Sequence, residues 1–170
     1  MYQKTTMLSM DTSTTCTGVA VYINGYLEKV LSLTTPKKEY DKEKYMINRI
    51  STCVKLYKPR IVILEDLNVM KNIAVAKKLS EIIGAVKGIC IYDDIFYDTL
   101  EPSKWRKLVA QNVADPVPRV RKDLKEWDIK VAKEYLKLDG RDLLIDIQND
   151  NEADAVLIGE AYKILTKSGD

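Results

Sequence analysis

The dipeptide Asn24-Gly25 constrains the fold of this chain more than any other feature of the sequence. It lies between residues 18–23 and 26–33, two runs rich in aliphatic and β-branched side chains. A two-residue turn needs positive φ at both positions, which Asn and Gly adopt readily, so the sequence predicts a tight β-hairpin here. A short apolar run over residues 5–10 precedes the hairpin. The chain is therefore expected to begin with three antiparallel strands.

After these strands the apolar period changes to that of helices. Apolar residues at helical spacing predict one helix that ends before Pro59 and a second helix over residues 72–90. Between them, residues 61–64 form a continuous apolar run, as expected for a strand covered on both faces. The remaining expectations are a short strand over 94–99, a brief helix over 102–110, a loop over 111–121 that contains Pro116 and Pro118, and helices over 128–138 and 152–166.

This order of elements predicts an α/β fold with a mixed five-stranded sheet. Three antiparallel strands are extended by two parallel strands, each reached through a helix, and helices cover both faces. That arrangement is the ribonuclease-H-like architecture. A length of 170 residues suits one domain, so we expect residues 1–170 to form a single domain.

The absence of histidine restricts the chemistry. The chain has no histidine, and its three cysteines are far apart in the sequence. These features exclude a Ser-His-Asp triad, a His-ligated zinc site and a zinc knuckle. Catalysis must use carboxylates, lysines, hydroxyl groups or a hard metal ion with oxygen ligands. No membrane helix and no signal peptide are recognisable, so we expect an intracellular protein without a membrane partner.

Three acidic residues are expected at the ends of elements. Asp11 ends the first strand, Glu65 ends the most apolar strand, and Asp154 lies in the first turns of the last helix. The strands that carry Asp11 and Glu65 are expected to be adjacent and parallel, so both acids reach the edge where open α/β sheets bind ligands. Asp150 and Asn151 share a helical face with Asp154. Taken singly, each acid is also compatible with a loop residue or a helix cap.

Carboxylates that converge repel one another unless a cation lies among them. Mg²⁺ or Mn²⁺ suits a set of oxygen ligands. Two such ions can activate a water molecule and stabilise the leaving oxygen of a phosphoryl displacement, which needs no histidine. We therefore predict a site for two ions per chain. Asp11, Glu65 and Asp154 are the predicted catalytic residues and metal ligands, and Asp150 and Asn151 are further candidate ligands.

Charge is distributed unevenly along the chain. Residues 102–137 contain 10 basic and 5 acidic side chains, whereas residues 138–170 contain 3 and 8. The basic stretch suits a surface that binds a polyanion, and the acidic stretch beside it suits a surface that attracts metal ions. Helix faces whose charges are simply solvated would give the same pattern. Trp105 and Trp127 lie in the basic stretch and are expected in the core rather than stacked on an unpaired base. The candidate DNA-binding residues are Lys71, Lys77, Lys78, Lys104, Arg106, Lys107, Arg119, Arg121, Lys122 and Lys125, with Asn68 and Asn72 as weaker candidates.

Four motifs resemble the RuvC-type Holliday-junction resolvases, in particular their phage-encoded branch. Residues 10–14 with 18–21 are similar to the opening of those proteins, and residues 62–65 to their second acidic strand. Residues 152–155 are similar to their closing helix, and residues 102–107 to a segment of the phage-encoded members. The resemblance spans nearly the whole chain. It implies a divalent-metal-dependent endonuclease that cleaves branched DNA as a homodimer in the cytoplasm, or in the host cytoplasm if a phage encodes it.

Asn151 departs from the pattern of that family. Members usually have an acidic residue or a histidine three positions before the last Asp, and an amide brings no charge to a metal site. The resemblance thus implies weaker binding of the second ion, which Asn151→Asp would restore. The rival account gives this ligand role to Asp150. For the dimer, the long apolar helix over residues 72–90 is the candidate interface.

Other functions remain compatible with the sequence. Residues 11–14 also resemble the phosphate-binding opening of actin-like ATPases and of accessory proteins of tRNA threonylcarbamoylation, but those proteins need a second comparable domain. Asn151 is compatible with a resolvase-like protein that binds branched DNA with weak cleavage or none. A ribonuclease-H-like nuclease that acts on RNA is a further alternative.

Overall fold

The first three strands form the predicted antiparallel meander. The structure, a computed structural model, describes residues 5–67, 72–113 and 115–167, apart from the side chain of Arg121. β1 (Thr6–Asp11) pairs with β2 (Cys16–Ile23), and β2 pairs with β3 (Tyr26–Thr34). Asn24 and Gly25 connect β2 to β3 with φ of 53° and 83°. These positive values are those that a two-residue hairpin turn requires, so the predicted hairpin is confirmed.

Two parallel strands extend the sheet on the other side of β1. β4 (Ile61–Glu65) pairs with β1, and β5 (Phe96–Leu100) pairs with β4, which gives the order β3-β2-β1-β4-β5. Each parallel strand follows a helix, α1 (Lys42–Tyr57) before β4 and α2 (Ile73–Tyr92) before β5. The mixed five-stranded sheet is therefore as predicted.

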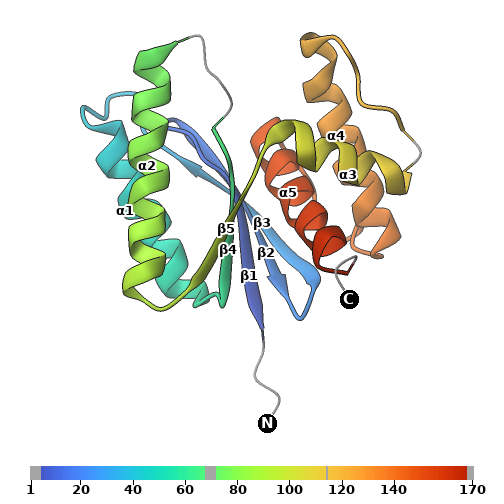
Figure 1. The fold of residues 1–170 in the computed structure, drawn as a ribbon, viewed down its shortest axis with the longest axis horizontal. Helices are drawn as coiled ribbons and strands as arrows, with labels where there is room; N and C mark the ends of the chain where they lie inside the picture. Colours follow the sequence, from blue (N-terminus) through green and yellow to red (C-terminus); the bar gives the residue numbers. More distant parts are fainter. Residues whose placement is uncertain (1–4, 68–71, 114, 168–170) are drawn as a thin grey trace.

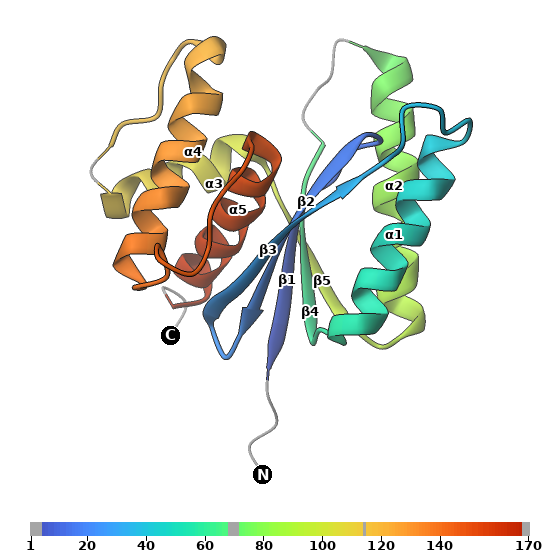
Figure 2. The ribbon, with the colours of Figure 1, turned by 180° about the vertical axis from the view of Figure 1, so that it is seen from behind.

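Helices cover both faces of this sheet (Figures 1 and 2). α1 and α2 pack on one face, and α5 (Asp150–Lys167) packs on the other with α3 (Pro102–Val113) and α4 (Arg121–Leu138). Successive side chains of a strand point to opposite faces, so Leu8 joins the α1–α2 side and Met7 the α5 side. Among the described helices, none combines the length and apolar character needed to cross a bilayer.

The loop predicted over residues 111–121 is shorter than expected. α3 continues to Val113, and α4 begins at Arg121 rather than at residue 128. The two prolines that indicated a loop lie before α4, whereas residues 121–127 contain no helix breaker and several good helix formers. Trp127 consequently lies inside α4. It is buried, as is Trp105 in α3, so the expectation that both belong to the core is confirmed.

The start of α5 lies directly against the β2–β3 hairpin. A Cβ atom on Gly18 would be 1.9 Å from the backbone oxygen of Asn151, so this approach requires glycine. The side chain of Asn149 accepts a hydrogen bond from the backbone N–H of Glu152 at 3.0 Å. The buried carboxylate of Glu152 accepts one from Ser32 Oγ at 2.6 Å. These contacts fix the first turn of α5 on the sheet.

Candidate active site

The parallel pairing of β1 and β4 places Asp11 beside Glu65. The register pairs Met10 with Leu64, and the next residues of the two strands are the two acids. The two carboxyl groups therefore lie at the same edge of the sheet. Burial raises the pKa of Asp11 well above its usual range, and the charge of Glu65 raises it further. At the carboxyl edge of the sheet, the charge of Glu65 thus opposes the ionisation of Asp11.

Asp154, near the start of α5, brings a third carboxylate to this edge of the sheet. Burial raises the pKa of Asp154 well above its usual range, and the charges of Asp128 and Asp11 contribute. Its Oδ1 atom is buried and receives no hydrogen bond from the described residues. A buried carboxylate oxygen without a partner is unfavourable, and a bound cation would satisfy it.

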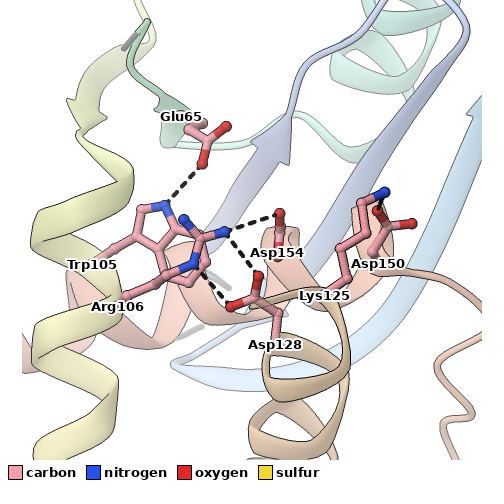
Figure 3. Close-up of polar contacts among 7 residues, drawn as sticks. All are labelled: Glu65, Trp105, Arg106, Lys125, Asp128, Asp150 and Asp154. Atoms are coloured by element: carbon pink, nitrogen blue, oxygen red, sulfur yellow. Dashed lines mark hydrogen bonds and ion pairs between the residues drawn. The ribbon is translucent and has the colours of Figure 1, made fainter. Parts of the chain in front are cut away.

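Two consecutive residues of α3 contact two of these acids (Figure 3). Trp105 Nε1 donates a hydrogen bond to Glu65 Oε1 at 3.0 Å, and Arg106 Nη2 lies 3.6 Å from Asp154 Oδ2. Burial raises the pKa of Glu65, while the hydrogen bond from Trp105 and the charge of Arg106 oppose that rise. Trp105 is therefore a core residue that also holds a site carboxylate.

Asp128 in α4 is the partner that holds Arg106. The Nε and Nη2 atoms of Arg106 donate to the two carboxylate oxygens of Asp128 at 3.0 and 2.8 Å. The guanidinium also lies over the indole ring of Trp105, 4.1 Å from its centroid. Burial disfavours the charge of Arg106, but the hydrogen bonds and charge of Asp128, together with the charges of Asp154 and Glu65, raise its pKa above the usual value. Asp128 is not among the residues that the sequence motifs predict, and Arg106 is predicted as a phosphate contact, whereas the fold places it inside the site.

Asp150 and Lys125 form an ion pair at the rim of the cleft (Figure 3). Asp150 lines the cleft together with Asp154, and its charge adds to the raised pKa of Asp11. Asn151 is not among the described residues that line the cleft, and its backbone packs against Gly18. Of the two further candidate ligands, Asp150 is therefore the one that the fold places in the cleft.

The cleft has a volume of about 900 Å³ and opens above the carboxyl ends of β1 and β4. Its two walls differ in character. One wall consists of apolar side chains from α2, namely Val75, Leu79 and Ile83. The other carries basic side chains from α3, α4 and the loop between them, namely Arg106, Arg119 and Lys125. Acids at the base of the cleft and basic groups on one wall suit a phosphodiester substrate together with a cation.

The other predicted DNA-binding residues differ in whether their charges are paired with acidic groups of the protein. Lys104, Lys107 and Lys122 are exposed and form no ion pair within the described part of the chain, and the same holds for Lys77. The ammonium of Lys78 instead lies 2.7 Å from Glu43 Oε1, so it is neutralised within the protein.

The remaining predicted DNA-binding residues give no support for a phosphate contact. Lys71, Asn68 and the side chain of Arg121 lie outside the described residues. Asn72 has a local structural role, because its side chain accepts hydrogen bonds from the backbone N–H groups of Ala74 and Val75 at the start of α2.

Within residues 5–67, 72–113 and 115–167, no three acidic or cysteine side chains form a ready-made metal cage. Glu65 Oε1 accepts a hydrogen bond from Trp105, and Asp154 Oδ2 faces Arg106, so each of these carboxylates already has a partner in the protein. The donor chemistry nevertheless fits a hard cation. The cleft offers carboxylate oxygens, and Asp154 Oδ1 is a buried one without a partner.

Comparisons with known proteins relate this fold to resolvases. No family model and no curated protein sequence matches the chain. RuvC of Thermus thermophilus, solved in complex with a Holliday junction substrate, aligns with a TM-score of 0.71 and 14% identity over 96% of each chain. The fowlpox virus resolvase in complex with Holliday junction DNA gives 0.63 and 17%, over 95% of this chain and 98% of that one. The yeast mitochondrial Holliday junction resolvase aligns with a TM-score of 0.64 and 11% identity, over 95% of this chain and 80% of that one.

Fold and site together define the class. The chain is an α/β protein with the ribonuclease-H-like fold and a carboxylate-lined cleft at the carboxyl edge of its sheet. Its mixed sheet and flanking helices resemble those of RuvC and of the other Holliday-junction resolvases compared, and the ribonuclease-H-like fold is the one that the order of elements predicted.

Proposed function

We propose that this chain is a divalent-metal-dependent endonuclease that cleaves branched DNA, such as Holliday junctions, by phosphodiester hydrolysis. One observation carries the proposal. Asp11, Glu65 and Asp154 come from β1, β4 and α5, yet they meet at the carboxyl edge of a ribonuclease-H-like sheet, where Glu65 and Asp154 line one cleft and Asp11 lies at the end of the strand beside Glu65. Two of the solved structures with this fold contain Holliday junction DNA, which supports branched DNA as the substrate class. A phage-encoded origin stays a prediction.

In this proposal the three acids hold the cation, and Asp150 at the rim is a further oxygen ligand. When bound, Mg²⁺ or Mn²⁺ supplies a Lewis acid for the phosphate and lowers the pKa of a coordinated water. The chain itself prepares the ligands. Trp105 fixes the orientation of Glu65. Burial raises the pKa of Asp11 and Asp154, so a cation would compete with protons for these two acids.

DNA would be held through its phosphates. Lys104, Lys107 and Lys122 are exposed on α3 and α4, the two elements that form the basic wall of the cleft. Arg119 lines the cleft itself. Contacts of this kind position a duplex independently of sequence and weaken as salt increases.

We also propose that the protein acts as a homodimer. A four-way junction has two symmetry-related strands to cut, and a two-fold protein presents two sites in a matching relation. Apolar side chains at the end of α2 and the start of β5 are exposed, with Ile91 68%, Tyr92 90% and Phe96 68% accessible. An exposed apolar surface of this kind suits an interface between two chains.

The direct test is incubation with four-way, three-way and linear DNA, in Mg²⁺ and in EDTA. We expect cutting of the four-way junction in Mg²⁺ alone, and none by an Asp11→Asn variant. Equal cutting of linear duplex, or cutting in EDTA, would contradict the proposal. An RNA–DNA hybrid in the same series addresses the alternative of a nuclease that acts on RNA.

A second candidate function is binding of branched DNA without cutting. It is favoured by one observation, because the described acidic side chains do not form a ready-made metal cage. On this account, four-way junctions are bound tightly but remain intact over the full range of Mg²⁺ and Mn²⁺ concentrations. Gel-shift and nicking assays on the same DNA distinguish the two functions.

A further inference from the structure

We propose that the uncovered part of the apolar face of α2, formed by Val75 and Leu79, holds unpaired bases of the DNA strand that is cut. This inference rests on the proposed function, and it names the feature of branched DNA that the cleft recognises. Its basis is the different chemistry of the two walls of the cleft, one apolar and one basic, with carboxylates between them.

The apolar stripe of α2 is longer than the part of it that the core covers. Ile82, Val86 and Cys90 are buried and belong to the core cluster between the sheet, α1 and α2. The same face continues toward the start of the helix with Leu79 and Val75, at spacings of three and four residues. These two side chains lie outside the core cluster, and Val75 is 43% exposed. The first turns of α2 therefore extend an apolar face into the cleft.

The wall on the other side of the cleft is charged. Figures 1 and 2 show the first turns of α2 and of α4 rising past the carboxyl edge of the sheet, on opposite faces of it. Arg119, just before α4, and Lys125 within it line the cleft on their side. Among the described residues, α2 contributes no charged side chain to the lining. One wall thus offers attraction for phosphates, and the other offers apolar contact.

A nucleotide has the same two-sided character, because its phosphate is charged and the faces of its base are apolar. A strand in the cleft with its phosphates toward Arg119 has its bases toward Val75 and Leu79. Burial of a base face against these side chains removes apolar surface from water on both partners. The two walls therefore fit a single strand in one orientation.

Only bases that have left the double helix can make this contact. In a continuous duplex, each base is stacked on its neighbours and paired with the opposite strand, so its faces are covered. Pairing and stacking are interrupted at a branch point, and unpaired bases are the ones that can be turned out at low cost. The apolar wall therefore favours branched DNA over a continuous duplex without reading its sequence.

The experiment compares two four-way junctions, one intact and one whose branch-point nucleotides lack their bases. Binding by the full chain is measured in EDTA by fluorescence anisotropy, so that no cutting interferes. We expect the unaltered protein to bind the intact junction about fivefold more tightly than the abasic one. We expect Val75→Ser to bind the two junctions equally. The four affinities form a cycle that isolates the contact between base and side chain.

Two further variants sharpen the comparison. Leu56→Ser is the matched control, because Leu56 is 71% exposed near the end of α1 and does not line the cleft. It should keep the fivefold difference. Val75→Phe offers an aromatic face on which a base can stack, so it should enlarge the difference. Thermal unfolding establishes that each variant is folded at the temperature of the measurement.

The outcomes separate this inference from the proposed function. Equal affinity of the unaltered protein for both junctions overturns the inference, and so does a fivefold difference that persists in Val75→Ser. In either case, Mg²⁺-dependent cutting of the four-way junction leaves the proposed function intact. If the unaltered protein neither cuts the intact junction nor binds it more tightly than linear duplex, the proposed function itself is wrong, and the inference falls with it.

Discussion

Trp105 donates a hydrogen bond from Nε1 to Glu65 Oε1 at 3.0 Å, and it thereby ties the first turn of α3 to the carboxyl end of β4. The indole is fully buried, so it has little freedom to reorient. The neighbouring residue, Arg106, faces Asp154 on α5. One turn of α3 therefore holds two acids that come from distant parts of the sequence.

Glu65→Gln should abolish junction cutting while leaving DNA binding in EDTA unchanged. The amide keeps the shape of the side chain and an acceptor for Trp105, but it removes the charge that a cation requires. Nicking and gel-shift assays on one four-way junction measure both properties. Glu126→Gln, an exposed acid on α4, is the control and should retain both. Full nuclease activity in Glu65→Gln would remove Glu65 from the site.

The magnesium requirement should depend on Asp150 rather than on Asn151. Asp150 lines the cleft, whereas the backbone of Asn151 packs on Gly18. We expect Asp150→Asn to raise the Mg²⁺ concentration for half-maximal cutting and Asn151→Asp to change it little. Lys125→Gln controls for loss of the ion pair with Asp150. A lower requirement in Asn151→Asp would instead restore the account in which residue 151 is the ligand.

Without metal, stability should fall as pH rises. Burial raises the pKa of Asp11 and Asp154, so the folded state binds protons more tightly than the unfolded chain. For such acids the loss of stability begins near the unfolded pKa of about 4 and continues as pH rises through the folded values. Asp11→Asn lacks one of these groups. In EDTA, its free energy of unfolding should therefore rise relative to that of the unaltered protein as the pH increases from 4 to 8.

Urea unfolding at several pH values, with EDTA and with Mg²⁺, checks this expectation. Mg²⁺ should stabilise the unaltered protein more at pH 8 than at pH 5, because it competes with protons for the same carboxylates. It should have little effect on Asp11→Asn. A variant that is less stable than the unaltered protein by the same amount at every pH would contradict the raised pKa of Asp11.

Lys104, Lys107 and Lys122 should contribute to DNA binding through charge alone. Changing each to Gln should weaken binding of junctions and linear duplexes alike, and should reduce the slope of log affinity against log salt by about one. Lys78→Gln is the matched comparison on α2. Its ammonium is bound by Glu43 at 2.7 Å, so the change should leave the slope unaltered. If Lys78→Gln reduces the slope equally, the ion pair between Lys78 and Glu43 must open when DNA binds.

Light scattering should give twice the 19.4 kDa mass of the chain at micromolar concentration. Tyr92→Lys places a charge in the exposed apolar surface at the end of α2, and we expect it to shift the mass toward the monomer. Leu143→Lys is the control, since Leu143 is 93% exposed in the segment between α4 and α5. A monomer mass for the unaltered protein, with and without junction DNA, would refute the homodimer.

The parts of this fold that the sequence predicts are those with local causes. Asn24-Gly25 determines the hairpin through its backbone preferences, and the apolar run in β4 reflects burial on both faces. The same logic gives the neighbouring positions of Asp11 and Glu65, because parallel strands end at the same edge. Such features need no knowledge of how helices pack.

The pairing of Arg106 with Asp128 has no such local cause. The two residues lie on different helices, and their contact depends on how α3 and α4 pack. In a run of basic residues, the helical turn directs Lys104 and Lys107 outward and Arg106 inward beside Trp105. The linear sequence therefore suggests a uniform basic surface, whereas the fold divides it into solvent-facing charges and one internal charge.

The close approach of Gly18 to the backbone of Asn151 also limits how this chain can vary in nature. A methyl group at position 18 would occupy the space of a peptide carbonyl, and the helix that carries Asp154 would have to slide along the sheet. We therefore expect natural variants of the chain to keep glycine at residue 18, because a side chain there would displace an acid it never touches. Gly18 has no side chain that could react or bind, yet the position of Asp154 depends on it.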